Sequence, residues 1–471
     1  MRTTRRGRAV LGLLAAAVLA GCTAVAVDAG DGPAPRPAAR PSASPSPSPV
    51  STALPTAEPR AALLPPADDG RAPTEAGLQA LVAAALADPA LADGLAVSVL
   101  DAGTGEPLHE RSAEEPLLPA STAKIVTAMA ALAALPADRR LRTRVVAGAA
   151  PGEVVLVGGG DPMLASPGAA ATYPEPARLA SLAARVRAAL GGAAVTRVLV
   201  DESLYAGERL APGWRVTYVT EGAVAPVGPL MVDGGRVRPQ RNARHGDPAL
   251  AAGRAFAALV QPGAEVAVDR GTAPAGAAAL GEVVSPPVSA LVERMLVRSD
   301  NDLAEALARQ VAVARGRPAS FAGAAQAVGE VLGPLLDDAG VARGAVRLVD
   351  GSGLSRSNRL QPAALTRLLA RVATGDDARL APVVSGLPVA GFDGTLAERY
   401  RRGRSLPGAG AVRAKTGTLD GVSALAGLVR TADGRLLAFD LTANAVPLGS
   451  TRRAERALDV LATRLAACGC R

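Results

Sequence analysis

Aromatic residues are scarce in this sequence. Phe, Tyr and Trp make up 2% of the 471 residues, although 49% of the chain is apolar. A core must therefore be built mainly from Ala, Val and Leu. The basic residues, which give a net charge of +8, are scattered and are not interleaved with aromatic residues as in proteins that stack bases. We therefore expect no nucleic-acid partner, whereas a basic surface also suits an anionic polymer or a membrane.

Histidine and cysteine are also rare. The two histidines, His109 and His245, are far apart and have no cluster of Cys or His around them. We therefore expect no metal, no cofactor and no Ser-His-Asp triad. The three cysteines do not form a disulfide framework. Cys468 and Cys470 could pair in a tight ring, stay free, or bond to another molecule.

Lysine is the rarest charged residue. Lys and Arg together number 51, and only Lys124 and Lys415 are lysines. An Arg side chain stays protonated in proteins, whereas burial can make a Lys amine release its proton. These two positions are therefore candidates for proton transfer or for binding an anion.

The N-terminus has the features of an export signal. Arginines precede an apolar run over residues 10–20, which is too short to favour a membrane-spanning mature helix. Leu19-Ala20-Gly21-Cys22 resembles a bacterial lipobox, and Ala24-Val25-Ala26 is a competing cleavage site. We expect a signal segment over residues 1–26 and a lipid on Cys22. The chain would then be exported and anchored at the outer face of the cytoplasmic membrane, next to the cell wall.

The chain after the signal divides into a linker and three further parts. Residues 27–73 are rich in Pro, Ala and Ser and predict an extended linker. The first part of a main domain is expected over residues 74–142, an inserted smaller α/β domain over 143–284, and the second part of the main domain over 285–471. The mixture of helices and hairpins predicts an α+β fold.

Apolar periodicity and turn residues set the expected elements. The expected strands are 95–101, 107–112, 152–157, 197–201, 412–419, 423–430 and 435–443. The expected helices are one capped by Thr74, followed by 121–135, 175–190, 288–297, 302–315 and 451–467.

Three short motifs combine the residue types of a serine acyl-transfer site. They are Ser121-Thr122-Ala123-Lys124, Ser299-Asp300-Asn301 and Lys415-Thr416-Gly417. Each motif alone is a weak signal. Together they are a strong one, because both lysines of the chain fall inside the set.

Ser121 and Lys124 are three residues apart at the start of an expected helix, so their side chains share one face. A neutral Lys124 amine could take the Ser121 proton as general base. We expect burial and a nearby second cation, Lys415, to lower the pKa of Lys124. The helix N-terminus should favour negative charge on Ser121. The alternative is that Ser121 only caps the helix.

The second motif is expected on a loop between two helices. Ser299 could relay a proton to a leaving amine, and Asn301 could hydrogen-bond the lysine and the substrate amide. The motif could at the same time cap the helix that is expected to begin at Asp302.

The third motif lies on an expected strand. Gly417 would let a substrate approach the backbone closely. Lys415 with the hydroxyls of Thr416 and Thr418 could bind a terminal carboxylate. The backbone N–H groups of Thr418 and Ser121 could form an oxyanion hole. The alternative is an ordinary edge strand.

With these motifs the chain resembles the D-alanyl-D-alanine carboxypeptidase/endopeptidase family of low-molecular-mass penicillin-binding proteins, which carry an insertion between the first two motifs. The resemblance extends over residues 75–465 and includes segments 156–162, 350–355, 391–396 and 413–419. It implies a penicillin-binding-protein/β-lactamase-like fold, with a mostly antiparallel sheet flanked by helical clusters. It also implies cleavage of D-Ala-D-Ala on peptidoglycan stem peptides through an acyl-enzyme, and covalent inhibition by β-lactam antibiotics.

Two other functions stay open at this point. A serine β-lactamase or esterase would use the same serine. Class A β-lactamases, however, carry a Glu-x-x-Leu-Asn loop between the second and third motifs, and no such sequence lies between Ser299 and Lys415. A wall-binding lipoprotein without turnover would have no need of a base lysine. The sequence does not decide between carboxypeptidase and endopeptidase action.

Overall fold

The computed structural model describes residues 70–91 and 94–468. The expected signal segment, most of the expected linker, Cys22 and Cys470 lie outside these residues. Within them, no helix has both the length and the apolar character that crossing a bilayer requires.

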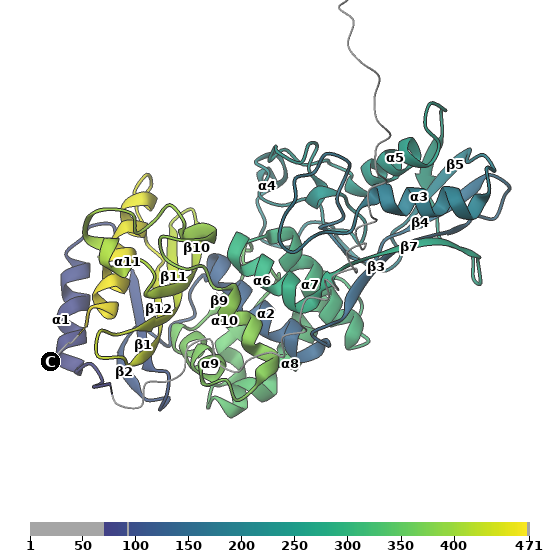
Figure 1. Cartoon of the computed structure of the whole chain (residues 1–471). Coiled ribbons are helices and arrows are strands. Elements are labelled where there is room, and N and C mark those ends of the chain that lie inside the picture. Colours follow the sequence, from purple (N-terminus) through teal and green to yellow (C-terminus); the bar gives the residue numbers. More distant parts are fainter. Residues whose placement is uncertain (1–69, 92–93, 469–471) are drawn as a thin grey trace, which may run out of the picture. The chain divides into compact units, whose positions relative to one another are not determined.

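The main sheet is fully antiparallel and has the strand order β10-β11-β12-β1-β2. Every residue of β1 and β12 is buried, because helices cover both faces of the sheet (Figure 1). The strands are β1 (Leu95–Asp101), β2 (Pro107–Arg111), β10 (Val412–Leu419), β11 (Val422–Arg430) and β12 (Leu436–Ala443). The expected strands in these regions are confirmed to within one or two residues.

One face of this sheet packs against the first and last of the described helices, α1 (Glu75–Leu86) and α11 (Thr451–Ala466). The Thr74 side chain caps α1 by accepting from Gly77 N, as the sequence predicts. Leucines on α11 face the core, and arginines occupy its outer face.

The other face packs against α9 (Pro362–Thr374), and a cluster of helices surrounds α2 (Ala123–Ala134). Ten of the twelve residues of α2 are buried, and four of these are alanines. Small side chains let neighbouring helices approach closely, which suits a chain with few aromatic residues. The helices around α2 are α6 (Val288–Arg298), α7 (Asn301–Ala314), α8 (Phe321–Asp338) and α10 (Ala381–Gly386). A two-stranded sheet, β8 (Val346–Arg347) and β9 (Arg359–Leu360), lies in the same part of the chain.

A second, mixed sheet has the strand order β6-β5-β4-β3-β7. The pairs β4–β5 and β5–β6 are parallel, and β3 pairs antiparallel with β4 and β7. Its strands are β3 (Arg140–Ala147), β4 (Glu153–Val157), β5 (Arg197–Asp201), β6 (Ala267–Arg270) and β7 (Ala279–Pro287). The segment expected as an insertion, 143–284, begins inside β3 and ends inside β7.

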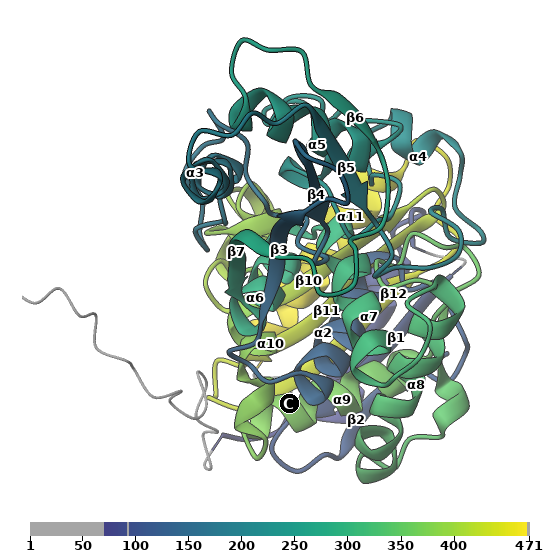
Figure 2. The same ribbon diagram turned by 90° about the vertical axis from the view of Figure 1, so that its right-hand side faces the viewer.

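Two helices, α3 (Leu179–Leu190) and α5 (Pro248–Val260), pack against this sheet and each other (Figure 2). The helix expected over 175–190 starts four residues late, because Pro174 and Pro176 precede it and proline disfavours the helical conformation of the residue before it. The short helix α4 (Thr217–Thr220) lies in the long loop between β5 and α5.

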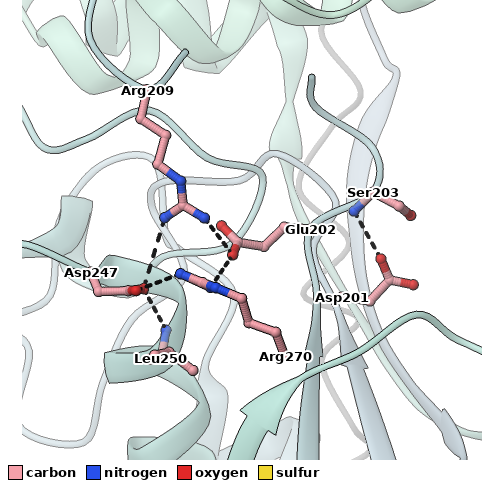
Figure 3. A network of polar contacts seen from close by, with 7 residues as sticks. All are labelled: Asp201, Glu202, Ser203, Arg209, Asp247, Leu250 and Arg270. Carbon is pink, nitrogen blue, oxygen red and sulfur yellow. Dashed lines mark hydrogen bonds and ion pairs between the residues drawn. The ribbon is translucent and has the colours of Figure 1, made fainter. Parts of the chain in front are cut away.

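Two arginines and two carboxylates join the ends of β5 and β6 to the start of α5 (Figure 3). Glu202 Oε2 accepts hydrogen bonds from Arg209 Nη2 and Arg270 Nη1, both at 2.7 Å. Arg270 Nη2 also donates to Asp247, whose other oxygen caps α5 by accepting from Leu250 N at 3.1 Å. Because the charges alternate in sign, the network holds the loop after β5 against the sheet.

A buried arginine fastens that same loop to α7. Arg309 is 1% exposed, and its Nη1 donates to Ala206 O at 3.0 Å and to Ala319 O. Its guanidinium carbon lies 4.2 Å from the centre of the Phe321 ring. The cation is therefore compensated by carbonyl oxygens and a ring face, and the loop is held beside the helix that follows the second motif.

The buried carboxyl group of Asp440 on β12 makes stability depend on pH. Burial raises its pKa to about 7, against a smaller opposite effect of the hydrogen bond from Thr442 Oγ1 at 2.6 Å. The folded state then binds more protons than the unfolded state between pH 4 and 7, so stability falls as pH rises through that window. We expect Asp440→Asn to flatten this dependence by about 1–3 kcal/mol between pH 5 and 8.

Urea unfolding at the two pH values measures the effect. The exposed Asp138→Asn is the matched control and should keep the wild-type dependence. An unchanged pH dependence in Asp440→Asn would contradict the assignment.

Candidate active site

The three sequence motifs meet at one place in the structure. Ser121 lies in a 3-10 turn, Ala120–Thr122, immediately before α2. The second motif joins α6 to α7, and Lys415 lies on the edge strand β10. The helix expected from residue 121 thus begins at Ala123, and the Ser121 side chain is not its N-cap.

Lys124 reaches three oxygen atoms from three parts of the chain. Its Nζ donates to Ser121 Oγ at 2.9 Å, to Asn301 Oδ1 at 2.6 Å and to Ser352 O at 2.6 Å. All three donor positions of an ammonium group are therefore used, and the Ser121 hydroxyl is held within proton-transfer distance of the amine.

Burial sets the protonation of Lys124. The side chain is fully buried, which lowers its pKa to about 8, while the carboxylates of Asp350 and Glu305 oppose this by raising it. At pH 7 about one molecule in ten then has a neutral amine. Burial also holds the pKa of Lys415 well below its usual value, and the charge of Lys124 lowers it further. The lowering of the Lys124 pKa by Lys415 stays a prediction.

The second motif has a strained backbone that fixes its side chains. Ser299 ends α6 with a φ of +53°, in the left-handed region that non-glycine residues rarely occupy. The Asp300 carboxylate caps α7 by accepting from Leu303 N at 3.1 Å, so α7 begins at Asn301 and not at the expected Asp302. Asn301 Nδ2 donates to Ala223 O at 2.8 Å, and this turns its Oδ1 toward the lysine.

Lys415 makes a second lysine–serine pair. Its Nζ donates to Ser299 Oγ at 2.8 Å and to Thr416 O at 2.9 Å, and the side chain is fully buried. Ser121 and Ser299 thus each accept a hydrogen bond from a different lysine. Ser121 and Ser299 themselves are partly exposed, so a ligand can reach both hydroxyls.

The rest of the third motif lines the same edge. Thr416 Oγ1 and Thr395 Oγ1 share a hydrogen bond of 2.8 Å, and the exposed Thr418 donates to Glu455 Oε1 at 3.0 Å. A Cβ atom at Gly417 would lie 2.8 Å from Pro119 O, so only glycine lets β10 pass this close to the turn that carries Ser121.

Sequence reasoning missed Glu305, and it noted Asp350 only within segment 350–355. Glu305 on α7 is buried and accepts from Gly351 N at 3.0 Å and Ser352 N at 2.8 Å, which aims the Ser352 carbonyl at Lys124. Burial raises the pKa of Glu305 to about 7. The available signal was its position four residues after Asn301, on the same helix face.

Asp350 is the centre of a second set of contacts. Its Oδ2 accepts from Trp214 Nε1 at 2.6 Å and from Ser355 N at 2.7 Å, and its Oδ1 accepts from Asn358 Nδ2 at 2.7 Å. Trp214, the single tryptophan of the chain, thus ties the long loop after β5 to the segment that holds Lys124.

Among residues 70–91 and 94–468, no group of three or more His, Cys, Asp or Glu side chains is arranged to hold a metal ion.

Comparison with known proteins agrees with the resemblance found in the sequence. The chain matches the D-Ala-D-Ala carboxypeptidase 3 (S13) family over residues 78–261 and 240–465. It is 42% identical over 421 residues to a carboxypeptidase of Mycobacterium tuberculosis, covering 87% of this chain and 88% of that one. It is 43% identical over 410 residues to the carboxypeptidase DacB of Mycolicibacterium smegmatis, covering 84% and 85%.

A solved structure confirms the fold. Penicillin-binding protein 4 of Haemophilus influenzae superposes with a TM-score of 0.65 at 23% identity, over 82% of this chain and 98% of that chain. The expected α+β fold of the penicillin-binding-protein type is correct. The chain belongs to the D-Ala-D-Ala carboxypeptidase 3 (S13) family.

Proposed function

We propose that this chain is a serine D-alanyl-D-alanine carboxypeptidase that trims peptidoglycan stem peptides, with Ser121 as nucleophile. The observation that carries the proposal is the 2.9 Å contact between Lys124 Nζ and Ser121 Oγ. Membership of the family, and the names of the relatives that are 42–43% identical, support the same activity.

Acylation starts with the neutral form of Lys124. The amine takes the proton of Ser121, and Ser121 Oγ attacks the carbonyl carbon of the penultimate D-Ala. Asn301 and the Ser352 carbonyl hold the resulting ammonium group through the hydrogen bonds that they already make. Because these acceptors are in place beforehand, little reorganisation accompanies the proton transfer.

Departure of the terminal D-Ala needs a proton on its nitrogen. Ser299 Oγ, held by Lys415 at 2.8 Å, is placed to donate that proton. The proton that Lys124 took from Ser121 then replaces it on Ser299, which leaves Lys124 neutral for the next step. The C–N bond then breaks, D-Ala leaves as a free amino acid, and the rest of the peptide stays on Ser121 as an ester. A water molecule that gives its proton to Lys124 hydrolyses this ester and restores the serine.

Residues of the third motif would bind the substrate. Lys415 and the hydroxyls of Thr416 and Thr418 would bind the terminal carboxylate, which competes with Glu455 for the Thr418 hydroxyl. The backbone N–H groups of Ser121 and Thr418 would bind the oxyanion. The same chemistry on a D-Ala to diamino-acid cross-link differs only in the leaving amine, so endopeptidase action is compatible with this site.

A serine β-lactamase is the second candidate. A β-lactam ring would acylate Ser121 in the same way, but the opened ring keeps its leaving group tethered, and no Glu-x-x-Leu-Asn sequence lies between Ser299 and Lys415 to activate water. The penicilloyl enzyme should therefore be long-lived, and β-lactams should inhibit.

The reaction outcome separates the two candidates. Detergent-solubilised full-length protein should release D-Ala from a peptide ending in Lys-D-Ala-D-Ala, measured by a D-amino-acid assay. It should bind benzylpenicillin at about one molecule per chain, detected by intact mass and located on Ser121 by digestion. Rapid multiple-turnover penicillin hydrolysis without D-Ala release would move the chain to the β-lactamases.

The base assignment is tested at Lys124. Lys124→Arg keeps the charge but removes the base, because arginine stays protonated. The rate of penicillin acylation should fall at least about a hundredfold. The rate for the wild type should rise with pH and level off above about 8, since burial lowers the pKa of Lys124 to about 8 and the neutral amine is the active form.

Lys415→Arg is the matched control. It keeps a cation for the carboxylate, so its loss should be smaller than that of Lys124→Arg. Circular dichroism checks that both variants fold. Normal acylation by a folded Lys124→Arg protein would show that another group is the base.

We also infer that the chain is exported and held at the membrane by a lipid on Cys22. The support is the sequence Leu19-Ala20-Gly21-Cys22 followed by a Pro/Ser-rich segment, which would place the peptidase within reach of the wall. The partners would then be the stem peptides of peptidoglycan and the membrane.

Cys22→Ala should move the protein from the membrane fraction to the medium, because the acyl chains that hold it are lost. Immunoblotting of the two fractions measures this, and Cys468→Ala serves as a cysteine control that should stay in the membrane fraction. Full membrane retention of Cys22→Ala would indicate an uncleaved signal anchor.

A further inference from the structure

A groove of about 580 Å³ lies outside the active site, between α1, α11 and the segment that follows Arg402. Its basic lining residues are Arg402, Arg404, Arg453, Arg456 and Arg464. Figure 1 shows α1 and α11 side by side on the same face of the main sheet. We call this surface the arginine groove.

Among the residues that the structure describes, the arginine groove is lined by five arginines and one carboxylate. Its single acidic lining residue, Asp88, accepts from Arg453 Nε at 2.7 Å. The other four arginines make no ion pair among residues 70–91 and 94–468. Like charges that converge on one groove repel one another, and an anion bound between them removes that repulsion.

Part of the lining of the arginine groove is apolar. It is formed by Leu81, Ala84, Ala85, Ala457, Val460 and Leu461. On the segment that bears Arg402 and Arg404, the side chain of Leu406 is 50% exposed. Guanidinium groups bind phosphate in a bidentate manner. An exposed leucine side chain, by contrast, is buried only by a ligand that has an apolar part. The combination fits a ligand that has both a phosphate and a hydrocarbon part.

We propose that the arginine groove docks this chain onto membranes that contain anionic phospholipids. The headgroup phosphates would contact the four unpaired arginines, and Leu406 would enter the acyl boundary. The proposal goes beyond the peptidase reaction and does not depend on lipidation of Cys22.

Hydrogen–deuterium exchange on the full-length chain tests the proposal. The protein is reconstituted in vesicles of phosphatidylcholine alone, or of phosphatidylcholine mixed with phosphatidylglycerol. Peptides that cover residues 400–408 should exchange at least about threefold more slowly in the anionic vesicles. Peptides that cover residues 236–244 should not change.

Variants separate docking from general charge. Replacing Arg402, Arg404, Arg456 and Arg464 by Gln should abolish the difference between the two vesicles. Replacing Arg238, Arg241, Arg254 and Arg347 by Gln removes the same charge from exposed positions elsewhere and should keep the difference. The smaller change Arg402→Gln/Arg404→Gln, confined to an exposed segment, should already weaken it.

Three outcomes would overturn the proposal. They are equal exchange in the two vesicles, a difference that survives in the groove variant, and protection by soluble polyphosphate in detergent without protection by the anionic vesicles. The last would assign the groove to a soluble anionic polymer. Release of D-Ala from a soluble peptide in detergent should be the same in the groove variant and the parent, so a failure of the peptidase assignment is recognised separately.

Discussion

Two lysine side chains buried in one site are the constraint on which the structure depends. An ammonium group removed from water is strongly destabilising unless hydrogen-bond acceptors replace its hydration. Lys124 finds them on Ser121, Asn301 and the Ser352 carbonyl, and Lys415 finds them on Ser299 and its own strand. Helices α2 and α7, the segment around residue 352 and strand β10 therefore have to meet at one point for either lysine to be buried.

Much of this arrangement was predictable from local sequence. Short apolar and β-branched runs bounded by turn residues placed β1 and β10 at their observed ends, because such runs are a property of neighbouring residues. The scarcity of lysine identified Lys124 and Lys415, and the structure brings each of them to a serine of the motif set. Turn and helix-start residues were less reliable: a 3-10 turn precedes α2, and Asp300, not a later residue, caps α7.

The unpredicted part consists of contacts between distant segments. Nothing near Trp214 indicates that its indole donates to Asp350, 136 residues later. The balance of effects on the pKa of Lys124 was also not predictable, because the carboxylates of Asp350 and Glu305 oppose the effect of burial there. The burial of the two lysines and the carboxylates near them result from the packing of whole helices and strands. A short sequence motif does not contain this information.

The order of strands in the main sheet has a consequence for biosynthesis. Strand β1 lies beside β12, and Asp101 pairs with Arg435, 334 residues further along the chain. The second sheet, by contrast, is closed within residues 140–287. As the polypeptide is made from its N-terminus, the second sheet can form early, whereas β1 has only β2 beside it until β12 has been made. The site that joins Ser121 and Lys124 to Lys415 on β10 therefore stays unformed until the last strands of the main sheet have been made.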